Sequence, residues 1–233
     1  PLQPTSLRGN RWVMLYACDQ CAYAYAEPIA RKSEAPQVLE RFAKMIRKKT
    51  GADRFSGKNE NEKAPMVMGG IRSDNEPVLR SQAWRDVCER YNIEETHSVP
   101  YEPQMNGTAE RFVQTVKNAL RVVTAHTDVR LWDFAVEHIV RIWNMRKRKR
   151  PGISNCCSPD EVVAQVTTNR MANRRGVSGR QKYLRRYGCL AYFKPHLTKA
   201  DKDAGVGTAL QPKRRRGVHL GFSAKNSSWL IGT

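Results

Sequence analysis

Hydrophobic residues along this chain of 233 residues follow two spacings, one typical of strands and one typical of helices. Two nearly continuous apolar runs, at residues 11–18 and 22–29, predict a pair of strands, and the short polar link that begins at Asp19 suits a hairpin turn. A helical spacing of apolar residues follows, with Ser33 as the expected N-cap and Lys49 near the end. This part of the chain therefore predicts a β-hairpin followed by a helix.

The middle of the chain predicts alternating strands and helices. A short apolar run at residues 66–71 predicts a buried strand that ends close to Asp74. A helix is expected to begin at Ser81, and a further strand is expected over residues 93–99. Because ligands of α/β proteins bind beyond the ends of strands, Asp74 is expected at the rim of a sheet, where a carboxylate can be functional.

A long amphipathic helix is predicted after the turn at Asn106-Gly107 and is expected to reach about residue 126. Apolar residues recur in it at intervals of three and four, namely Ala109, Phe112, Val113, Val116, Leu120 and Val123. The opposite face presents Glu110, Gln114, Lys117 and Arg121. Another helix is predicted over residues 131–144, and we expect its two tryptophans in the core rather than stacked on nucleic-acid bases.

The last third of the chain changes character. Residues 165–186 are polar and basic, which predicts a linker, and the apolar runs at 187–193 and 217–222 predict strands. We therefore expect an α/β domain over residues 1–164, the linker, and a small β-rich module over residues 187–233.

A strongly positive charge narrows the choice of partner. The chain has 41 Lys and Arg against 22 Asp and Glu, a formal net charge of +19 and a pI near 10.1. Such a field favours a polyanion, and DNA or RNA is the expected partner. Five consecutive basic residues follow the predicted helix at 131–144, namely Arg146, Lys147, Arg148, Lys149 and Arg150. They are interpreted either as a solvated helix end or as phosphate contacts or a nuclear import signal.

The expected cellular compartment depends on two features that the sequence lacks. It shows no long uninterrupted apolar run and no amino-terminal signal segment, so we expect neither a membrane span nor secretion. The six cysteines are then expected as reduced thiols in the cytoplasm or the nucleus. Cys18 and Cys21 form a Cys-x-x-Cys pair without further ligands at zinc spacing, so core packing is expected rather than a metal site.

Two carboxylates are candidates for metal chemistry. Asp74 and Glu110 are separated by 35 residues, enough for a helix and a strand, so both could converge on one place. Mg²⁺ is typically held by one or two carboxylates together with phosphate oxygens, and Lys117 would direct a cation at the same phosphates. The alternative is structural, with Asp74 in a turn and Glu110 as an ordinary acid of a first helical turn.

The residues that flank these carboxylates favour the metal-binding interpretation over the structural one. Residues 73–75 read Ser-Asp-Asn, and residues 100–111 read Pro-Tyr-x-Pro-Gln-x-Asn-Gly-x-x-Glu-Arg. This pair of motifs resembles the integrase catalytic core of LTR retrotransposons, of the copia type in particular. Later segments at residues 158–161, 187–193 and 217–222 are similar to the region that follows the core in the same polyproteins, so the resemblance covers nearly the whole chain.

The resemblance implies a ribonuclease H-like fold and an Asp, Asp, Glu triad that binds two Mg²⁺ or Mn²⁺ ions. In that family the site trims the ends of the element's DNA and joins them to target DNA. Asp74 then corresponds to the second acid and Glu110 to the third. The implied partners are the element's DNA ends and target DNA, and the full integrase is expected to be a homo-oligomer. Phosphate contacts are expected from Gln114, Lys117 and Arg121 and from the basic run at residues 146–150.

Two departures from the family pattern bear on activity. The alignment of Ser6, Gly9 and Arg11 with family positions places the first acid upstream of Pro1, and Asp19 is the weaker alternative within this chain. In addition, Glu76 stands where the family has Gly, which alters the charge next to Asp74.

Three functions therefore follow from the sequence. The first is an integrase segment that processes DNA ends and transfers strands. The second is an incomplete or decayed fragment that only binds nucleic acid through its basic surface. The third is a ribonuclease H or junction nuclease of the same fold, which the motif at residues 100–111 argues against.

Overall fold

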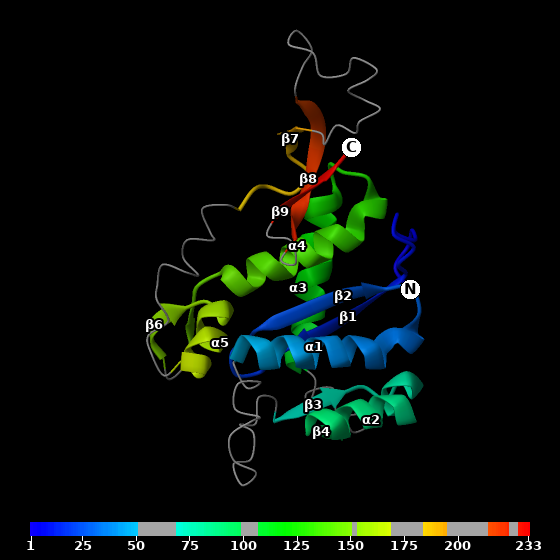
Figure 1. The fold of residues 1–233 in the computed structure, drawn as a ribbon, viewed down its shortest axis with the longest axis vertical. Helices are drawn as coiled ribbons and strands as arrows, with labels where there is room; N and C mark the ends of the chain where they lie inside the picture. Colours follow the sequence, from blue (N-terminus) through cyan, green and yellow to red (C-terminus); the bar gives the residue numbers. More distant parts are fainter. Residues whose placement is uncertain (51–68, 99–106, 151–152, 169–183, 195–213, 224–227) are drawn as a thin grey trace, which may run out of the picture.

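A computed structural model describes residues 1–50, 69–98, 107–150, 153–168, 184–194, 214–223 and 228–233. In these residues the chain is a mixed α/β protein, as predicted, with strands in two- and three-stranded sheets that are covered by helices (Figure 1). The ribonuclease H-like arrangement and the three domain boundaries stay predictions, and residues 169–183 of the expected linker lie outside the described part.

The amino-terminal hairpin is formed by β1 (Trp12–Ala17) and β2 (Ala24–Ile29), which pair antiparallel. Neighbouring side chains of β1 point to opposite faces of the hairpin. One face packs into a cluster with the following helix through Met14 and Tyr16, and the other contributes Val13, Leu15 and Ala17 to a second cluster. Because helices cover both faces, the strand is apolar at nearly every position, which is the pattern that predicted it.

The first helix, α1 (Ala35–Thr50), packs on one face of the hairpin, where the ring of Phe42 stacks on that of Tyr16 at 4.7 Å. A short 3-10 turn, η1 (Lys32–Glu34), precedes it. The expected N-cap at Ser33 is therefore wrong. The helical turn begins one residue after Arg31, whose backbone N–H donates to the Glu34 carboxylate at 2.8 Å. The carboxylate three residues along satisfies an amide that would otherwise be unpaired.

A parallel pair follows, formed by β3 (Gly70–Ser73) and β4 (Glu94–His97), with helix α2 (Gln82–Tyr91) as the crossover. The 3-10 turn η3 (Pro77–Arg80) leads into α2. Helix α2 begins one residue after Ser81, where its start was predicted, and Ser81 is its N-cap, because its hydroxyl accepts from the backbone N–H of Trp84 at 3.3 Å. The buried Trp84 side chain fixes α2 on the core cluster that also contains α1.

Two helices cover the other face of the hairpin, namely α3 (Gly107–Thr124) and α4 (Trp132–Met145), which are joined through the 3-10 turn η5 (Val129–Leu131). Their contact includes an edge-on packing of the rings of Phe112 and Trp143 at 5.0 Å. The indole N–H of Trp143 donates to the carbonyl of Ala22 at 2.8 Å. Both tryptophans of α4 thus belong to the core, as predicted, with Trp132 2% exposed.

The chain then forms a second hairpin, β5 (Arg148–Arg150) with β6 (Ile153–Cys157), and a helix, α5 (Pro159–Thr168). The sequence analysis did not predict these elements. Helix α5 begins with a capping box, in which the Ser158 hydroxyl accepts from the N–H of Glu161 and the Glu161 carboxylate accepts from the N–H of Ser158.

The carboxyl-terminal strands β7 (Leu190–Phe193), β8 (Arg215–Ser223) and β9 (Ser228–Gly232) form an antiparallel sheet in that order. The sheet packs on α4, where Tyr187 and Leu220 share a buried cluster with Ala135. Of the helices that the structure describes, none has both the length and the apolar character to cross a membrane.

Candidate functional site

Asp74 lies directly after β3, in a short segment that is held on both sides. The carbonyl of Ser73 accepts from the backbone N–H of Ser98 at 3.0 Å, and the side-chain amide of Asn75 donates to the carbonyl of Ser98 at 3.0 Å. The guanidinium of Arg80 also donates to the side chain of Asn75. These bonds fix the backbone around Asp74 at the end of the strand, which is where the sequence placed it.

The carboxylate of Asp74 itself is exposed and forms no hydrogen bond or ion pair with any residue that the structure describes. A held backbone with a free carboxylate differs from a structural turn acid, whose oxygens would accept from nearby amides. The geometry at Asp74 therefore favours a group that is available to a ligand.

Next to Asp74 lies a polar pair that the sequence analysis did not assign. The hydroxyl of Ser73 and Nδ1 of His97 are 3.0 Å apart, and Nε2 of His97 lies 2.9 Å from the carboxylate of Glu95. The parallel register of β3 and β4 sets Ser73 opposite His97, so the pairing of two strands brings these groups together. No sequence motif marks this contact.

Glu76, which was expected to alter the charge next to Asp74, has its own charge paired within the chain. Its carboxylate forms an ion pair with Nζ of Lys32 at 2.6 Å, and the ammonium also lies over the ring of Trp12. The expected disturbance of charge beside Asp74 is thus offset by a lysine from another part of the chain.

Glu110 lies in the first turn of α3 and is exposed. Gln114, Lys117 and Arg121 follow it at intervals of four, three and four residues and are exposed too, while Phe112 and Val116 are buried. The predicted division of α3 into a polar and an apolar face is therefore confirmed except at Ala109, which is exposed. Asn118 lies within the polar face and accepts from the side chains of Gln114 and Arg121 at 3.0 and 3.3 Å.

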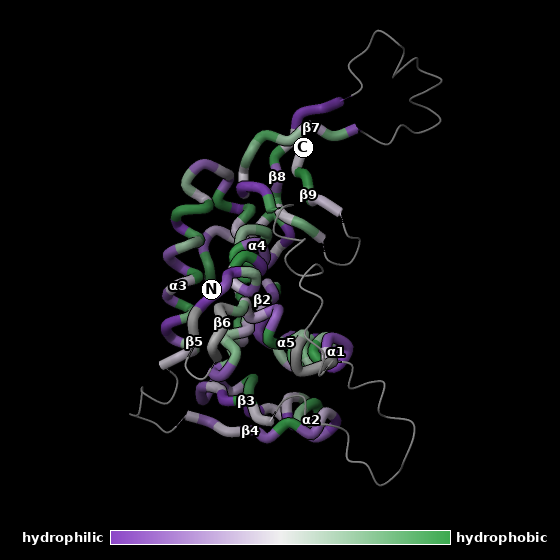
Figure 2. The backbone as a smooth tube through the Cα atoms, turned by 90° about the vertical axis from the view of Figure 1, so that its left-hand side faces the viewer, coloured by the Kyte–Doolittle hydropathy of each residue, from purple (hydrophilic) through white to green (hydrophobic). Residues whose placement is uncertain are grey.

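Glu110 resembles Asp74 in being free of hydrogen bonds and ion pairs to the described residues. Figures 1 and 2 show α3 running along the long axis of the molecule, past the hairpin and toward the β3–β4 pair. The amino-terminal end of α3 is the end nearer that pair, since residues toward its other end pack with the carboxyl-terminal sheet. The meeting of the two carboxylates over a shared ion stays a prediction, and the motif at residues 100–106 lies outside the described residues.

Asp19, the weaker alternative for a first acid, is exposed in the turn between β1 and β2. In the described part of the chain, no group of three or more His, Cys, Asp or Glu residues is arranged to hold a metal ion. The structure therefore does not place Asp19 in a cluster of three such side chains within its described part.

The basic run after α4 is only partly free. Arg146 and Lys147 are exposed, although Nζ of Lys147 lies 4.0 Å from the carboxylate of Glu161. The guanidinium of Arg148 stacks on the ring of Trp143 at 3.4 Å. The interpretation as a helix end is wrong for residues 148–150, because α4 ends at Met145 and these residues form β5. The side chains of Lys149 and Arg150 lie outside the description.

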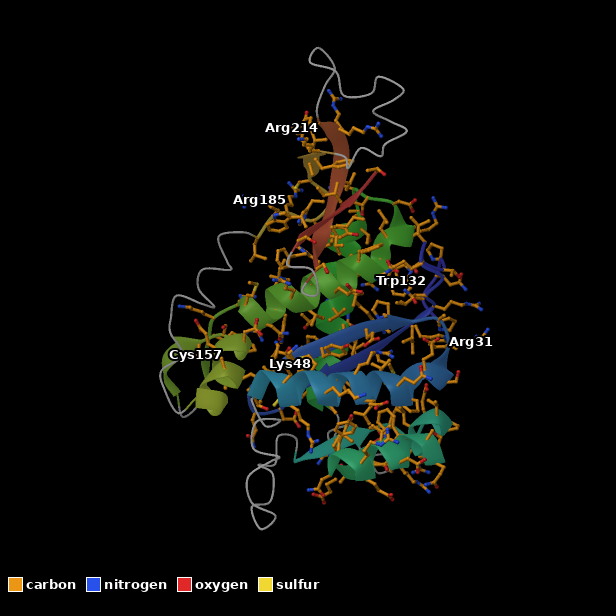
Figure 3. The ribbon with its side chains drawn as sticks, in the orientation of Figure 1. Arg31, Lys48, Trp132, Cys157, Arg185 and Arg214 are labelled. Carbon is orange, nitrogen blue, oxygen red and sulfur yellow. The ribbon has the colours of Figure 1, made fainter. Side chains whose placement is uncertain are left out.

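A second basic surface accompanies the carboxyl-terminal sheet. Its exposed arginines are Arg185, Arg186, Arg214, Arg215 and Arg216. Figure 3 shows Arg185 and Arg214 at the end of the molecule that carries this sheet, away from α2 and β3. Positive charge is therefore distributed along the molecule rather than confined to the run after α4.

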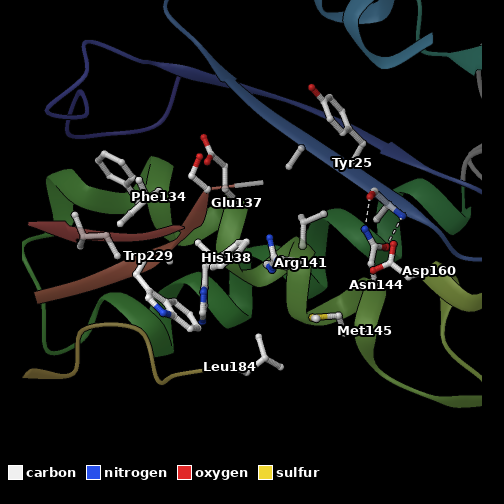
Figure 4. Close-up of a pocket in the computed structure, with 18 of the residues that line it drawn as sticks. Tyr25, Phe134, Glu137, His138, Arg141, Asn144, Met145, Asp160, Leu184 and Trp229 are labelled. Carbon is white, nitrogen blue, oxygen red and sulfur yellow. Dashed lines mark hydrogen bonds between the residues drawn. The ribbon is translucent and has the colours of Figure 1, made fainter. Parts of the chain in front are cut away.

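The structure also contains a cavity of about 730 Å³ that sequence reasoning missed. It lies between α4, the hairpin and the carboxyl-terminal sheet, and His138, Arg141 and Trp229 are among the residues that line it (Figure 4). Asp74 and Glu110 do not line it. Burial lowers the pKa of His138 to about 4, with smaller contributions from the nearby His219 and Arg141, so His138 is neutral near pH 7.

The Cys-x-x-Cys pair lies in the turn between β1 and β2, not within a strand. Cys21 is partly buried against the core cluster of α1, whereas Cys18 is exposed. The expectation of core packing is therefore wrong for Cys18, because the strand ends one residue before it.

Among the comparisons with known proteins, the sequence similarity to curated proteins supports the predicted resemblance at a coarse level. No protein-family model matches the chain. Over 69 residues the chain is 41% identical to the Transposon Tf2-3 and Tf2-4 polyproteins of Schizosaccharomyces pombe, a match that covers 30% of this chain and 5% of each polyprotein. The crystal structure of the catalytic core domain of BIV integrase aligns with a TM-score of 0.44 and 19% identity, over 74% of this chain and 90% of that one.

The chain thus matches only a small part of its curated relatives, whose names do not specify the copia type. The copia assignment stays a prediction from the motifs. Over those 69 residues this chain is similar to retrotransposon polyproteins, which agrees with the coarser part of the resemblance predicted from the motifs at residues 73–75 and 100–111.

Proposed function

We propose that the chain is the integrase segment of a retrotransposon polyprotein, with a ribonuclease H-like core that processes DNA ends and transfers DNA strands. The observation that carries this proposal is the pair of exposed carboxylates, Asp74 and Glu110, which have no partner among the described residues and lie within motifs that resemble that family. The sequence similarity to retrotransposon polyproteins supports it.

Both residues fit a hard divalent cation. Their oxygens are unpaired among the described residues and reachable from solvent, and Mg²⁺ and Mn²⁺ prefer such ligands together with phosphate oxygens. Bound Mg²⁺ or Mn²⁺ would supply positive charge that polarises the scissile phosphate and the attacking hydroxyl group. Asp74 and Glu110 would hold the cation, and Ser73, Asn75 and Ser98 keep the backbone at Asp74 in place.

The polar face of α3 would orient the substrate. Lys117 lies two turns from Glu110 on the same face, so its ammonium group would neutralise a phosphate that neighbours the reacting one. Gln114 and Arg121 would add contacts along the DNA backbone, and the exposed Arg146 and Lys147 would extend them. These contacts fix position without reading base sequence. A homo-oligomer would be needed to bring two DNA ends together.

The test is DNA cleavage and joining by the purified chain in Mn²⁺, compared with Asp74→Asn and Glu110→Gln. Both variants should lose activity by at least about 100-fold, since each removes a charge that the transition state requires. DNA affinity should change by less than about threefold. Glu89→Gln, which alters an exposed acid on α2, is the matched control and should remain fully active. Equal activity of all three variants would refute the assignment.

A fragment that only binds nucleic acid is the second candidate. It is favoured by the observation that the described residues contain no group of three metal-ligand side chains. This candidate predicts DNA binding that weakens steeply with salt but no Mn²⁺-dependent cleavage or joining. Binding of Mn²⁺, followed by calorimetry, should then be the same in the wild type and in Asp74→Asn. Cleavage activity that Asp74→Asn abolishes would exclude it.

A further inference from the structure

The turn between β1 and β2 brings two cysteines together in a fixed geometry. The backbone N–H of Cys18 donates to the carbonyl of Tyr23 at 2.8 Å, and the N–H of Ala22 donates to the carbonyl of Cys18 at 2.9 Å. Ala22 has φ of 47°, in the left-handed region, which lets the chain reverse after a single helical turn. Cys18 and Cys21, three residues apart in such a turn, lie on the same side of it.

The sulfur of Cys18 is already directed at Cys21. The backbone N–H of Cys21 donates to Sγ of Cys18 at 3.4 Å, so this sulfur lies against the residue that carries the second thiol. Cys18 is exposed and can be reached by a reagent, while Cys21 is partly buried against the core. The thiol of Cys18 is therefore placed to react first with a reagent from solvent, and the thiol of Cys21 is placed to react next with Cys18.

We propose that Cys18 and Cys21 form a reversible dithiol–disulfide pair that exchanges with small disulfides such as oxidised glutathione. The proposal is independent of the integrase assignment, because it depends only on the turn.

The exchange is balanced in two steps. The thiolate of Cys18 attacks one sulfur of the small disulfide, which forms a mixed disulfide and releases one small thiolate. The Cys21 thiol then loses its proton to solvent, and its sulfur attacks Sγ of Cys18, which forms the Cys18–Cys21 bond and releases the second small thiolate. The protein dithiol loses two electrons and two protons, and the small disulfide is reduced to two thiols.

Local hydrogen bonds favour the first step. The pKa of Cys18 is lowered to about 6, chiefly because the Cys21 side chain hydrogen-bonds to it and also because the backbone N–H groups of Cys21 and Gln20 point at its sulfur. Partial burial and the charge of Asp19 act in the opposite direction. By contrast, burial raises the pKa of Cys88 to about 11, which leaves that thiol unreactive.

Other uses of the pair fit less well. A structural zinc site needs four ligands, and the described residues provide no cluster of three or more suitable side chains. Cys157 ends β6 and Cys189 lies directly before β7, so neither belongs to the turn between β1 and β2. Cys18 and Cys21 are thus held close together by the backbone of one turn, as a disulfide bond between them requires.

Oxidation would act on a turn that is tied to the core. The carbonyl of Ala22 accepts from the indole of Trp143, and the same indole ring packs on Phe112 of α3. A bond between Cys18 and Cys21 would restrict the turn next to this contact, so the near-ultraviolet circular dichroism of tryptophan should report the redox state.

The test uses the full chain equilibrated without oxygen in mixtures of reduced and oxidised glutathione, followed by alkylation of free thiols and peptide mapping by mass spectrometry. The expected product is a peptide that contains a Cys18–Cys21 disulfide, with Cys88 alkylated only after unfolding. Cys21→Ser should stop at the first step and accumulate glutathione on Cys18. Cys18→Ser should take up at least about tenfold less glutathione at Cys21 in the same time.

Cys189→Ser is the matched control, because it removes one thiol outside the turn, and it should form the disulfide as the wild type does. Near-ultraviolet circular dichroism of each reduced variant verifies that the fold is kept. The proposal is overturned if the wild type carries glutathione on Cys18 without forming the internal bond. It is also overturned if both cysteines stay reduced under conditions in which a small Cys-x-x-Cys peptide is oxidised.

Discussion

His138 provides a sharp test of how the carboxyl-terminal sheet is attached to α4. Its side chain is 5% exposed and lies under β8, with the rings of His219 and Tyr187 at 5.9 and 5.6 Å. Nδ1 of His138 has no hydrogen-bond partner among the described residues, and the backbone of Gly221 lies close to it. A proton on this ring would have to be buried without compensation.

The sign of the effect follows from the direction of the pKa change. The pKa of His138 falls from 6.5 to about 4 in the folded chain, mainly through burial, and His219 and Arg141 lower it further because their charges oppose a second positive charge. Between these pH values the unfolded chain binds a proton that the folded chain does not. The contribution of the neutral His138 side chain to the free energy of unfolding is therefore fully present above about pH 6.5 and is lost as the pH falls toward 4.

The magnitude follows from the same values. A change from 6.5 to about 4 corresponds to roughly 3 kcal/mol of unfolding free energy, at about 1.4 kcal/mol for each pH unit. The pKa of His219 is lowered as well, again mainly by burial, so its loss of stability has the same sign. Carboxylates also titrate in this range, and a variant without the imidazole is needed to isolate the contribution of His138.

The assay is urea unfolding followed by tryptophan fluorescence between pH 7.5 and 4, for the wild type and for His138→Gln. The difference in unfolding free energy between the two proteins should shift by about 3 kcal/mol over this range, with the wild type losing more. His126→Gln, which changes an exposed histidine after α3, should follow the wild type closely. A constant difference between wild type and His138→Gln across the range would refute the reasoning.

Two further predictions concern single contacts. Asn144→Leu should destabilise the fold by about 2 kcal/mol in urea unfolding. The Asn144 amide pairs with both the N–H and the carbonyl of Ala24, at 2.8 and 2.7 Å, and these buried groups would lose their partner. As a control, Asn118→Ala on the exposed face of α3 should change stability by less than about 0.5 kcal/mol. Lys117→Gln should reduce the slope of log affinity for DNA against log salt by about one, measured by fluorescence anisotropy. Lys44→Gln on α1 is the control for the second prediction, and an equal change in both slopes would contradict a contact at Lys117.

Elements with a single strong signal could be predicted from the sequence. The strands β1 and β2 are apolar at nearly every position because both faces of the hairpin are covered, and the helical spacing of apolar residues identified α3 and its free polar face. The start of α2 near Ser81 could be predicted because the Ser81 hydroxyl needs only local backbone to accept a bond. These features depend on neighbours in the sequence, so local patterns report them.

Features that depend on distant partners could not be predicted. Strand β5 consists of Arg148, Lys149 and Arg150, a composition that indicates solvated surface until pairing with β6 is known. The contact of Ser73 with His97 depends on the register of two parallel strands, and the ion pair of Glu76 with Lys32 joins residues 44 positions apart. In the candidate site, the sequence therefore predicted the two carboxylates as ligands but gave no sign of the groups that surround Asp74.

The shared cluster of Tyr187, Leu220 and Ala135 has a practical consequence for anyone who shortens this protein. Deleting everything after residue 186 would expose Ala135 and its neighbours on α4 to solvent, and newly exposed apolar patches promote aggregation during expression. A soluble truncation should therefore keep the final strands or replace the uncovered side chains of α4 with polar ones.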